Sequence, residues 1–534
     1  MSLPSVHAEE KPYDYLIRGA TVYDGKSHRP FQADVAISGE EITAVGQLEA
    51  SDAKEIIDVD GLTLAPGFID AHTHSDFSPF IYSATNKLFQ GVTTEITGNC
   101  GMSAAPILGA HADQVRSVWA REGVDIPAQI TWASFREYQN EGDAVPTMTN
   151  LAALVGHGNI RSAVMGFANR KATAEEITQM KKILAAAMAE GAYGISFGLV
   201  YVPGVYADRQ ELIELCTEAA RHGGLCSFHM RSEGAALAQS VRETIEIGEK
   251  SKARIQISHL KAAGKRNWEK IDKALRIIEE ARARGVPIEA DAYPYTASFA
   301  ELGVLLPDDL YERPDRVAYF QEASHREELV KRLRRHYAER KMNWQAVMIA
   351  TTPHKSFQAY EGKTLADIAK TEKKDPERVL VEFLAGTNFE ISAFNFSQNE
   401  DVVAKILSRP YVSVGSDSIA EGTRRPHPRA YGTFPKVLGE FVRDKKVLRL
   451  GDAIVQMTSL PAEHFGLARR GRITSGYFAD LVLFRAEEIR DLADFQSGNR
   501  LSQGVVWLFV NGKPVIRQGR FMETKNGRFL LRGE

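Results

Sequence analysis

Short runs in which apolar and polar residues alternate occupy both ends of the chain, and turn-forming residues close each run. They cover residues 15–17, 33–37, 41–45 and 55–59 near the N-terminus, and residues 479–484 and 505–512 near the C-terminus. A period of two is typical of β-strands with one buried face. We expect residues 1–65 and 471–534 to build one small β-sandwich together, which requires the intervening chain to begin and finish near the same place.

Between these ends, apolar β runs alternate with helical periodicity. The β runs cover residues 154–157, 194–197, 225–230, 254–259 and 286–292, and the helical runs cover residues 173–191, 208–223, 240–250 and 267–285. Thr173 and Glu176 open one helix as a capping box, in which each side chain satisfies a free backbone amide. Strands and helices that alternate about every 30 residues are typical of a parallel sheet. We predict an α/β fold whose central domain, residues 66–470, is a TIM (β/α)8 barrel.

Residues 299–345 break this alternation. Pro307, Asp308 and Asp309 lead into a charged helical stretch over residues 326–340. We interpret the segment as an insertion after a late barrel strand, placed where it could form a lid beside the active face.

The bulk composition narrows the choice of partners. At 534 residues the chain exceeds what one core normally fills, and its 44% hydrophobic and 25% charged residues are ordinary for a soluble enzyme. The net charge of -3 leaves no excess of either sign, so nucleic acid and anionic membranes are poor partners. No stretch approaches the roughly 20 apolar residues of a membrane span. We expect a small-molecule substrate, and the sequence leaves the oligomeric state unknown.

Cysteine usage bears on location. Cys100, Cys216 and Cys226 are an odd number in a long chain, which does not favour a disulfide framework. We therefore expect a reducing compartment, the cytoplasm. Export is the alternative, because Val6-His7-Ala8 resembles the small-x-small pattern that precedes a leader cleavage site.

Two histidines close the apolar run of residues 66–74. His72 and His74 are two positions apart, so on a strand both imidazoles lie on one face. At the C-terminal end of a first barrel strand they would point into the mouth, where barrel active sites lie. We interpret them as metal ligands; the alternative is a pair of exposed turn histidines.

Cys100, His229 and His259 also follow β runs. Alone, each would more often be a buried packing residue. Together they meet at one point only in a barrel, and a thiolate with imidazoles is a donor set suited to zinc. Asp417 follows another β run; it is either an N-cap or Asx-turn residue, or the general base that zinc-dependent hydrolysis requires.

On these residues the chain resembles the amidohydrolase superfamily, and within it the N-acyl-D-amino-acid deacylase (D-aminoacylase) family. The similarity runs from about Tyr13 to Gly519. The motifs that carry it lie at residues 97–101, 198–204, 258–261, 291–295 and 427–435. The resemblance implies zinc-dependent hydrolysis of the amide bond of N-acyl-D-amino acids, which yields a carboxylate and a free D-amino acid.

The resemblance also assigns the metal ligands and the base. Cys100, His229 and His259 would hold one zinc ion tightly. His72 and His74, with Cys100 able to bridge, would form a second site that is weak or empty. Asp417 would take a proton from the attacking water and deliver it to the leaving nitrogen.

Four residues match the family's contacts to substrate. Lys261, Tyr293 and Arg429 would bind the α-carboxylate, which suits two cations and a phenol, and Tyr201 would lie near the scissile carbonyl. A carboxylate clamp, a polarised carbonyl and a side-chain pocket are three fixed points, which discriminate D from L.

The side-chain pocket is expected to accept neutral or hydrophobic D-residues such as leucine, methionine, phenylalanine, valine or alanine. In relatives selective for acidic residues we expect an Arg or Lys just after the Tyr293–Tyr295 segment, but residues 296–306 offer Glu301 and apolar residues instead. An acidic side chain is therefore disfavoured.

Three alternatives remain open. The first is a dipeptidase for L-Xaa-D-Xaa, since the acyl group leaves few marks in a sequence. The second is a cyclic-amide hydrolase of the dihydroorotase or hydantoinase kind, although those relatives usually carry a carboxylated Lys where this chain has Cys100. The third is a non-catalytic binding protein that kept the barrel, which the presence of Asp417 and of every candidate histidine disfavours.

Overall fold

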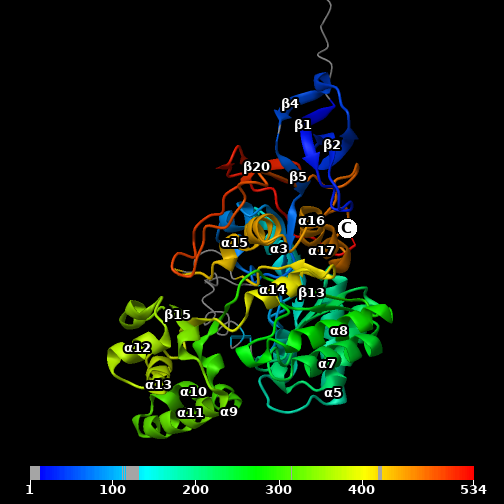
Figure 1. Ribbon diagram of the computed structural model, residues 1–534. Coiled ribbons are helices and arrows are strands. Elements are labelled where there is room, and N and C mark those ends of the chain that lie inside the picture. The colour runs from blue at the N-terminus through cyan, green and yellow to red at the C-terminus, as the bar shows by residue number, and fades with distance from the viewer. Residues whose placement is uncertain are drawn as a thin grey trace, which may run out of the picture.

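The structure is a computed structural model that describes residues 12–59, 61–110, 112–113, 115, 132–313, 315–418 and 424–533. Three parts are visible in Figure 1: a β-rich part at the top, a barrel with its helices from the middle to the lower right, and a green to yellow part at the lower left. The leader-like residues 1–10 lie outside the described ranges. Within those ranges, no helix has both the length and the apolar character needed to cross a membrane.

Parallel strands form the barrel. They are β6 (Phe68–Asp70), β7 (Val92–Thr97), β8 (Asn150–Ala153), β9 (Val155–Gly156), β10 (Gly194–Gly198), β11 (Leu225–His229), β12 (Arg254–Ile257), β13 (Ile288–Ala292) and β17 (Val412–Val414). Pairing runs from β6 through β7 to β8, and from β9 through β10, β11, β12 and β13 to β17. β8 and β9 are one strand interrupted at Leu154. The ends of β17 and β6 are joined by a hydrogen bond, in which the amide of Ala71, just after β6, donates to the Val414 carbonyl (3.2 Å). The strands therefore close the predicted TIM barrel.

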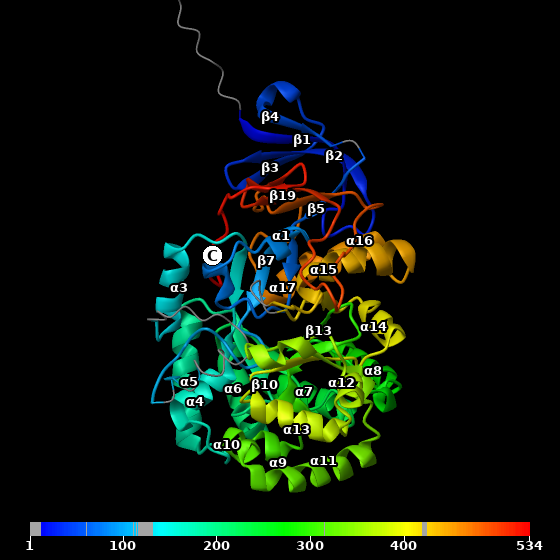
Figure 2. The ribbon, with the colours of Figure 1, turned by 90° about the vertical axis from the view of Figure 1, so that its left-hand side faces the viewer.

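Helices cover the outside of the barrel (Figure 2). They are α1 (Thr85–Leu88), α3 (Phe135–Ala144), α4 (His157–Met165), α5 (Ala174–Ala189), α6 (Arg209–Arg221), α7 (Leu237–Ser251), α8 (Lys270–Ala283), α14 (Glu400–Leu407), α15 (Arg429–Lys436), α16 (Leu450–Met457) and α17 (Ser459–Phe465). The predicted capping box opens α5, with the Glu176 amide donating to Thr173 Oγ1 (3.2 Å) and the Thr173 amide donating to Glu176 Oε2 (2.8 Å). Met180, Leu184 and Ala187 lie on one buried face of α5, because helical residues three and four apart share a side.

Both termini contribute to one nine-stranded sheet. Its strands are β1 (Tyr13–Val22), β2 (Phe31–Ser38), β3 (Glu41–Gly46), β4 (Ala53–Asp58), β5 (Thr63–Pro66), β18 (Leu481–Phe484), β19 (Val505–Val510), β20 (Lys513–Arg517) and β21 (Arg520–Phe521). β1 and β19 are not neighbours in the sheet, yet the rings of Tyr15 and Phe509 lie 5.4 Å apart. The sheet therefore curls until its halves face each other across one apolar core, as the predicted sandwich requires.

The inserted unit has its own sheet and its own core. β14 (Ser298–Glu301), β16 (Ser392–Asn395) and β15 (Val347–Thr351) pair antiparallel in that order. Its helices are α9 (Asp308–Tyr311), α10 (Arg316–Gln321), α11 (Arg326–Arg340), α12 (Leu365–Glu372) and α13 (Pro376–Gly386). Leu302, Phe320 and Leu380 belong to an apolar core separate from that of the barrel. We propose that residues 298–395 form this subdomain, which extends past the predicted 299–345 because β16 is the central strand of the sheet.

A C-terminal segment pairs with strand β8 of the barrel. Leu151 of β8 accepts from the Leu530 amide (2.8 Å) and donates to the Arg528 carbonyl (2.9 Å). Between these bonds, Phe529 is buried, with its ring 4.9 Å from that of Tyr138. The tail is therefore part of the barrel core.

Replacing Phe529 with alanine should lower the free energy of unfolding by about 3–5 kcal/mol, because a buried ring leaves a cavity when it is removed. Urea denaturation followed by circular dichroism measures the loss. Met522→Ala, a truncation of an exposed side chain seven residues earlier, is the control. Equal midpoints for the two variants would contradict the packing role of Phe529.

Candidate metal centre and active-site cavity

Three candidate ligands converge at the C-terminal mouth of the barrel. His229 is the last residue of β11, His259 follows β12 by two residues, and Cys100 follows β7 by three. One ligand atom from each lies within 4.8 Å of the other two. Cys100 Sγ lies 3.3 Å from His259 Nε2. The barrel thus brings together residues that are up to 159 positions apart in the chain.

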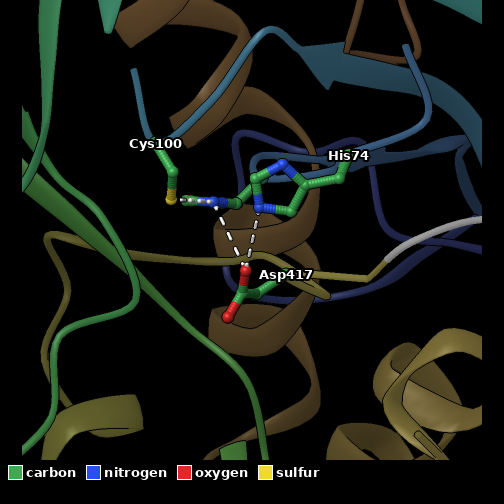
Figure 3. A group of neighbouring side chains, drawn as sticks. His74, Cys100 and Asp417 are labelled. Atoms are coloured by element: carbon green, nitrogen blue, oxygen red, sulfur yellow. Dashed lines mark hydrogen bonds and ion pairs between the residues drawn. The ribbon is translucent and has the colours of Figure 1, made fainter. Parts of the chain in front are cut away.

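A second group shares Cys100 with the first. It contains His72, His74, Cys100 and Asp417, again with ligand atoms within 4.8 Å of one another. Cys100 Sγ lies 3.4 Å from His72 Nε2, and His74 Nε2 lies 3.3 Å from Asp417 Oδ1. Figure 3 shows the His74 ring turned toward the Asp417 carboxylate. The two predicted sites are therefore adjacent, with the Cys100 sulfur common to both.

Three of these residues have a left-handed backbone conformation. Cys100, His259 and Asp417 have φ values of 54°, 35° and 50°, in the left-handed region that glycine favours. Each such residue costs on the order of 1–3 kcal/mol and persists only where its surroundings impose it. At Cys100 the surroundings are tight, because a Cβ on Gly198 would lie 2.0 Å from the Cys100 carbonyl oxygen. The fold therefore holds these three residues in a strained backbone conformation, in which their side chains converge on one point.

The donor set fits a tetrahedral zinc ion. Zinc bonds of about 2.0–2.3 Å place neighbouring ligand atoms about 3.3–3.8 Å apart, and Cys100 Sγ and His259 Nε2 are separated by 3.3 Å. Cys100, His229 and His259 are all buried, at 6%, 8% and 2% exposure. His229 Nδ1 is buried without a hydrogen-bond partner among the described residues. Two nitrogens and a sulfur in an enclosed position are donors that zinc prefers.

The charge state of the thiol also suits a metal. Burial raises the pKa of the Cys100 thiol, but His72 and His259 outweigh it and hold that pKa well below its usual value. The thiolate is the form that binds metal ions. Burial lowers the pKa of His74, but Asp417 and Cys100 raise it to about 9. The Cys100 thiolate is therefore stabilised by positive charge close to it. Protons on the neighbouring imidazoles or a bound metal cation can supply that charge.

Two carboxylates behind the ligands were not anticipated from the sequence. Glu233 Oε1 lies 2.7 Å from His259 Nδ1, and Asp291 Oδ1 lies 3.2 Å from His72 Nδ1. A carboxylate on the outer ring nitrogen fixes the orientation of a metal-binding histidine and makes it more basic. Glu233 follows His229 by four residues in a loop, and Asp291 ends a β run; neither position marks a ligand partner by itself.

A cavity of about 370 Å³ opens beside the two groups. Tyr201, Lys261 and Arg429 line it, as expected of residues that hold a substrate. Tyr293 lies behind them, with its ring centroid 4.8 Å from Arg429 Cζ and 5.7 Å from Lys261 Nζ. Burial raises the pKa of Tyr293 to about 12, so the phenol stays protonated and able to donate.

Asp417 is held as an ionised carboxylate. Arg429 Nη1 donates to its Oδ2 at 2.8 Å, while its Oδ1 faces His74. Burial raises the pKa of Asp417, but Arg429 and His259 outweigh it and keep that pKa well below its usual value. An ionised carboxylate beside the ligand groups can accept a proton, which is what the sequence-based interpretation of Asp417 requires.

The chain matches known proteins over nearly its full length. The family model described as amidohydrolase family matches residues 55–297 and 393–516, and its gap coincides with the inserted unit. D-aminoacylase of Alcaligenes xylosoxydans xylosoxydans is 35% identical over 98% of this chain and 99% of that protein.

Two solved structures extend the comparison. A D-aminoacylase structure with a binuclear metal centre, described by one-metal activation and second-metal attenuation, matches with a TM-score of 0.82 and 35% identity, covering 98% of this chain and 100% of that one. The N-acyl-D-glutamate deacylase of Bordetella bronchiseptica, complexed with zinc and a phosphonate that mimics the tetrahedral intermediate, matches with a TM-score of 0.81 and 31% identity over the same shares. The chain belongs to the amidohydrolase family and, within it, to the N-acyl-D-amino-acid deacylases.

Proposed function

We propose that the protein hydrolyses the amide bond of N-acyl-D-amino acids that carry a neutral or hydrophobic side chain, giving a carboxylate and a free D-amino acid. The observation that carries the proposal is the cluster of Cys100, His229 and His259, which lies beside Asp417 in a cavity lined by Lys261 and Arg429. Relatives of known activity, D-aminoacylase and N-acyl-D-glutamate deacylase, act on the same class of substrate.

Zinc is the proposed cofactor. Cys100, His229 and His259 would hold one ion tightly, and the ion would polarise the scissile carbonyl and acidify a water molecule. The group of His72, His74, Cys100 and Asp417 would form a weaker second site, because Asp417 is already engaged by Arg429. The one-metal activation described for the related D-aminoacylase supports this order.

Asp417 is the proposed general base and acid. Its carboxylate accepts a proton from the attacking water and then delivers it to the leaving nitrogen. The 2.8 Å hydrogen bond from Arg429 Nη1 to Oδ2 leaves Oδ1 directed at the ligand groups, and so fixes which oxygen moves the proton.

The substrate carboxylate would bind between two cations. Lys261 Nζ donates to Glu233 Oε1 (2.5 Å) and lies 2.7 Å from His259 Nδ1, which faces the same carboxylate. Its ammonium group has three N–H donors, so it retains donors for substrate. The Arg429 guanidinium lies over the Tyr293 ring, 4.8 Å from its centroid, and the Tyr201 ring lies 5.1 Å from the ring of His229. These contacts hold the α-carbon in one orientation, which gives D selectivity.

Zinc-loaded enzyme should hydrolyse N-acetyl-D-leucine at least about a hundredfold faster, in kcat/KM, than N-acetyl-L-leucine, because only one enantiomer satisfies all three contact points. The released amino acid is quantified for each isomer. The N-acetyl-D-glutamate rate should be lower than the N-acetyl-D-leucine rate. Turnover of neither isomer would contradict the proposal and redirect the assay to L-Xaa-D-Xaa dipeptides and then to cyclic amides.

A further inference from the structure

The inserted unit supplies the outer wall of the catalytic cavity. Phe299 and Glu301 of β14 line the cavity together with Val304, Leu306 and Tyr311. Apolar side chains predominate in this wall, which also holds two carboxylates: Glu301, which is buried at 7% exposure, and Asp308, which is exposed. Because the α-carboxylate and the scissile bond are assigned to the barrel side, this wall faces the substrate side chain.

Glu301 does not stand alone in that wall. Its Oε2 lies 3.2 Å from Arg316 Nη2 of α10, and the Arg316 side chain is only 14% exposed. Arg316 is fixed in place: its Nη1 donates to the Tyr311 carbonyl (3.0 Å), and its guanidinium carbon lies 4.7 Å and 4.8 Å from the ring centroids of Tyr311 and Phe389. The Arg316 guanidinium therefore lies directly behind the cavity wall that is assigned to the substrate side chain.

The Glu301 carboxylate is packed closely against Gly303. A Cβ on Gly303 would lie 2.7 Å from Glu301 Oε1 and 2.9 Å from Phe389 Cδ1. Both distances are too short for a side-chain contact, so a larger residue at position 303 would displace the Glu301 carboxylate and the Phe389 ring. Gly303 thus permits the buried pair of Glu301 and Arg316.

We propose that the Glu301–Arg316 ion pair determines side-chain specificity by cancelling the buried charges of this wall. Glu301 masks Arg316, so an acidic D side chain finds no free cation, and Arg316 masks Glu301, so a basic one finds no free anion. A charged side chain would then be desolvated without a partner, whereas a neutral one is not penalised. The inference rests on the proposed deacylase function and replaces the simpler idea that Glu301 alone repels acids.

Two single variants expose one charge each. Glu301→Gln leaves Arg316 unmasked and should raise the kcat/KM ratio of N-acetyl-D-glutamate to N-acetyl-D-leucine at least about tenfold. Arg316→Met leaves Glu301 unmasked and should raise the ratio of N-acetyl-D-lysine to N-acetyl-D-leucine by a similar factor. The double variant should return both ratios close to those of the natural chain.

Asp309→Asn is the matched control, because Asp309 is an exposed carboxylate of the same subdomain paired with an arginine, Arg332, at 2.5 Å. It should leave both ratios unchanged. Turnover of N-acetyl-D-leucine shows that each variant is folded. If one of the two single variants does not fold, the other one still tests the proposal. Unchanged ratios in an active single variant would overturn the proposal, whereas a natural chain that hydrolyses no N-acyl-D-amino acid would instead refute the proposed function.

Discussion

Asp417→Asn is expected to lower kcat for N-acetyl-D-leucine by about a thousandfold, within the range for loss of a general acid–base group. Asparagine keeps the shape of the side chain and an oxygen for the 2.8 Å contact with Arg429 Nη1, but it can neither accept nor deliver the proton. Steady-state rates at saturating substrate measure the loss.

Zinc content, measured by elemental mass spectrometry, separates a lost base from a lost metal site. It should be close to that of the natural chain, since Cys100, His229 and His259 are untouched. Asp309→Asn, an exposed carboxylate outside the cavity lining, should keep its activity. A variant at Asp417 that retained more than about a tenth of the natural rate would contradict the assigned role.

The second large effect is expected at the shared sulfur. Cys100→Ser should weaken zinc binding at least about a hundredfold, because a neutral hydroxyl replaces a thiolate that binds zinc as a soft, anionic donor. Competition with a chromophoric chelator measures the dissociation constant without reference to activity. Turnover at limiting zinc should fall in parallel.

Cys216→Ser is the control for this variant. Cys216 is also a fully buried thiol of the barrel, on α6, but it lies outside both ligand groups. Its replacement should leave zinc affinity unchanged. An equal loss of zinc in both variants would show that the effect of Cys100→Ser is one of folding and not of coordination.

The sequence predicted that the candidate site residues, which follow barrel strands, lie close together. In a parallel barrel, every strand delivers its C-terminal residues to the same mouth, so position along the strand is enough to predict convergence. His72, Cys100, His229, His259 and Asp417 each follow an apolar run, and the structure brings all of them together. The roles given to these residues remain predictions until the variants are measured.

Other features depended on contacts between distant segments. Glu233, in the loop after β11, and Asp291, in β13, each contact a candidate ligand histidine, and no spacing in the sequence predicts such a contact. The proposed extent of the inserted unit, residues 298–395, rests on the antiparallel pairing of β16 with β14 and β15, which lie far from it in the chain. Long-range pairing is decided by packing and not by local preference.

By itself, the sequence determined the alternation of strands and helices, the shared β domain of the two termini and the family, and it pointed to the candidate ligands, because each depends on local periodicity or on residue identity. Only the tertiary structure decided how charges are balanced. Three buried ion pairs form between segments that share no local pattern: Arg429 with Asp417, Lys261 with Glu233, and Arg316 with Glu301. The reason is physical: buried charges are stable only beside a partner, and the identity of that partner is set by the fold.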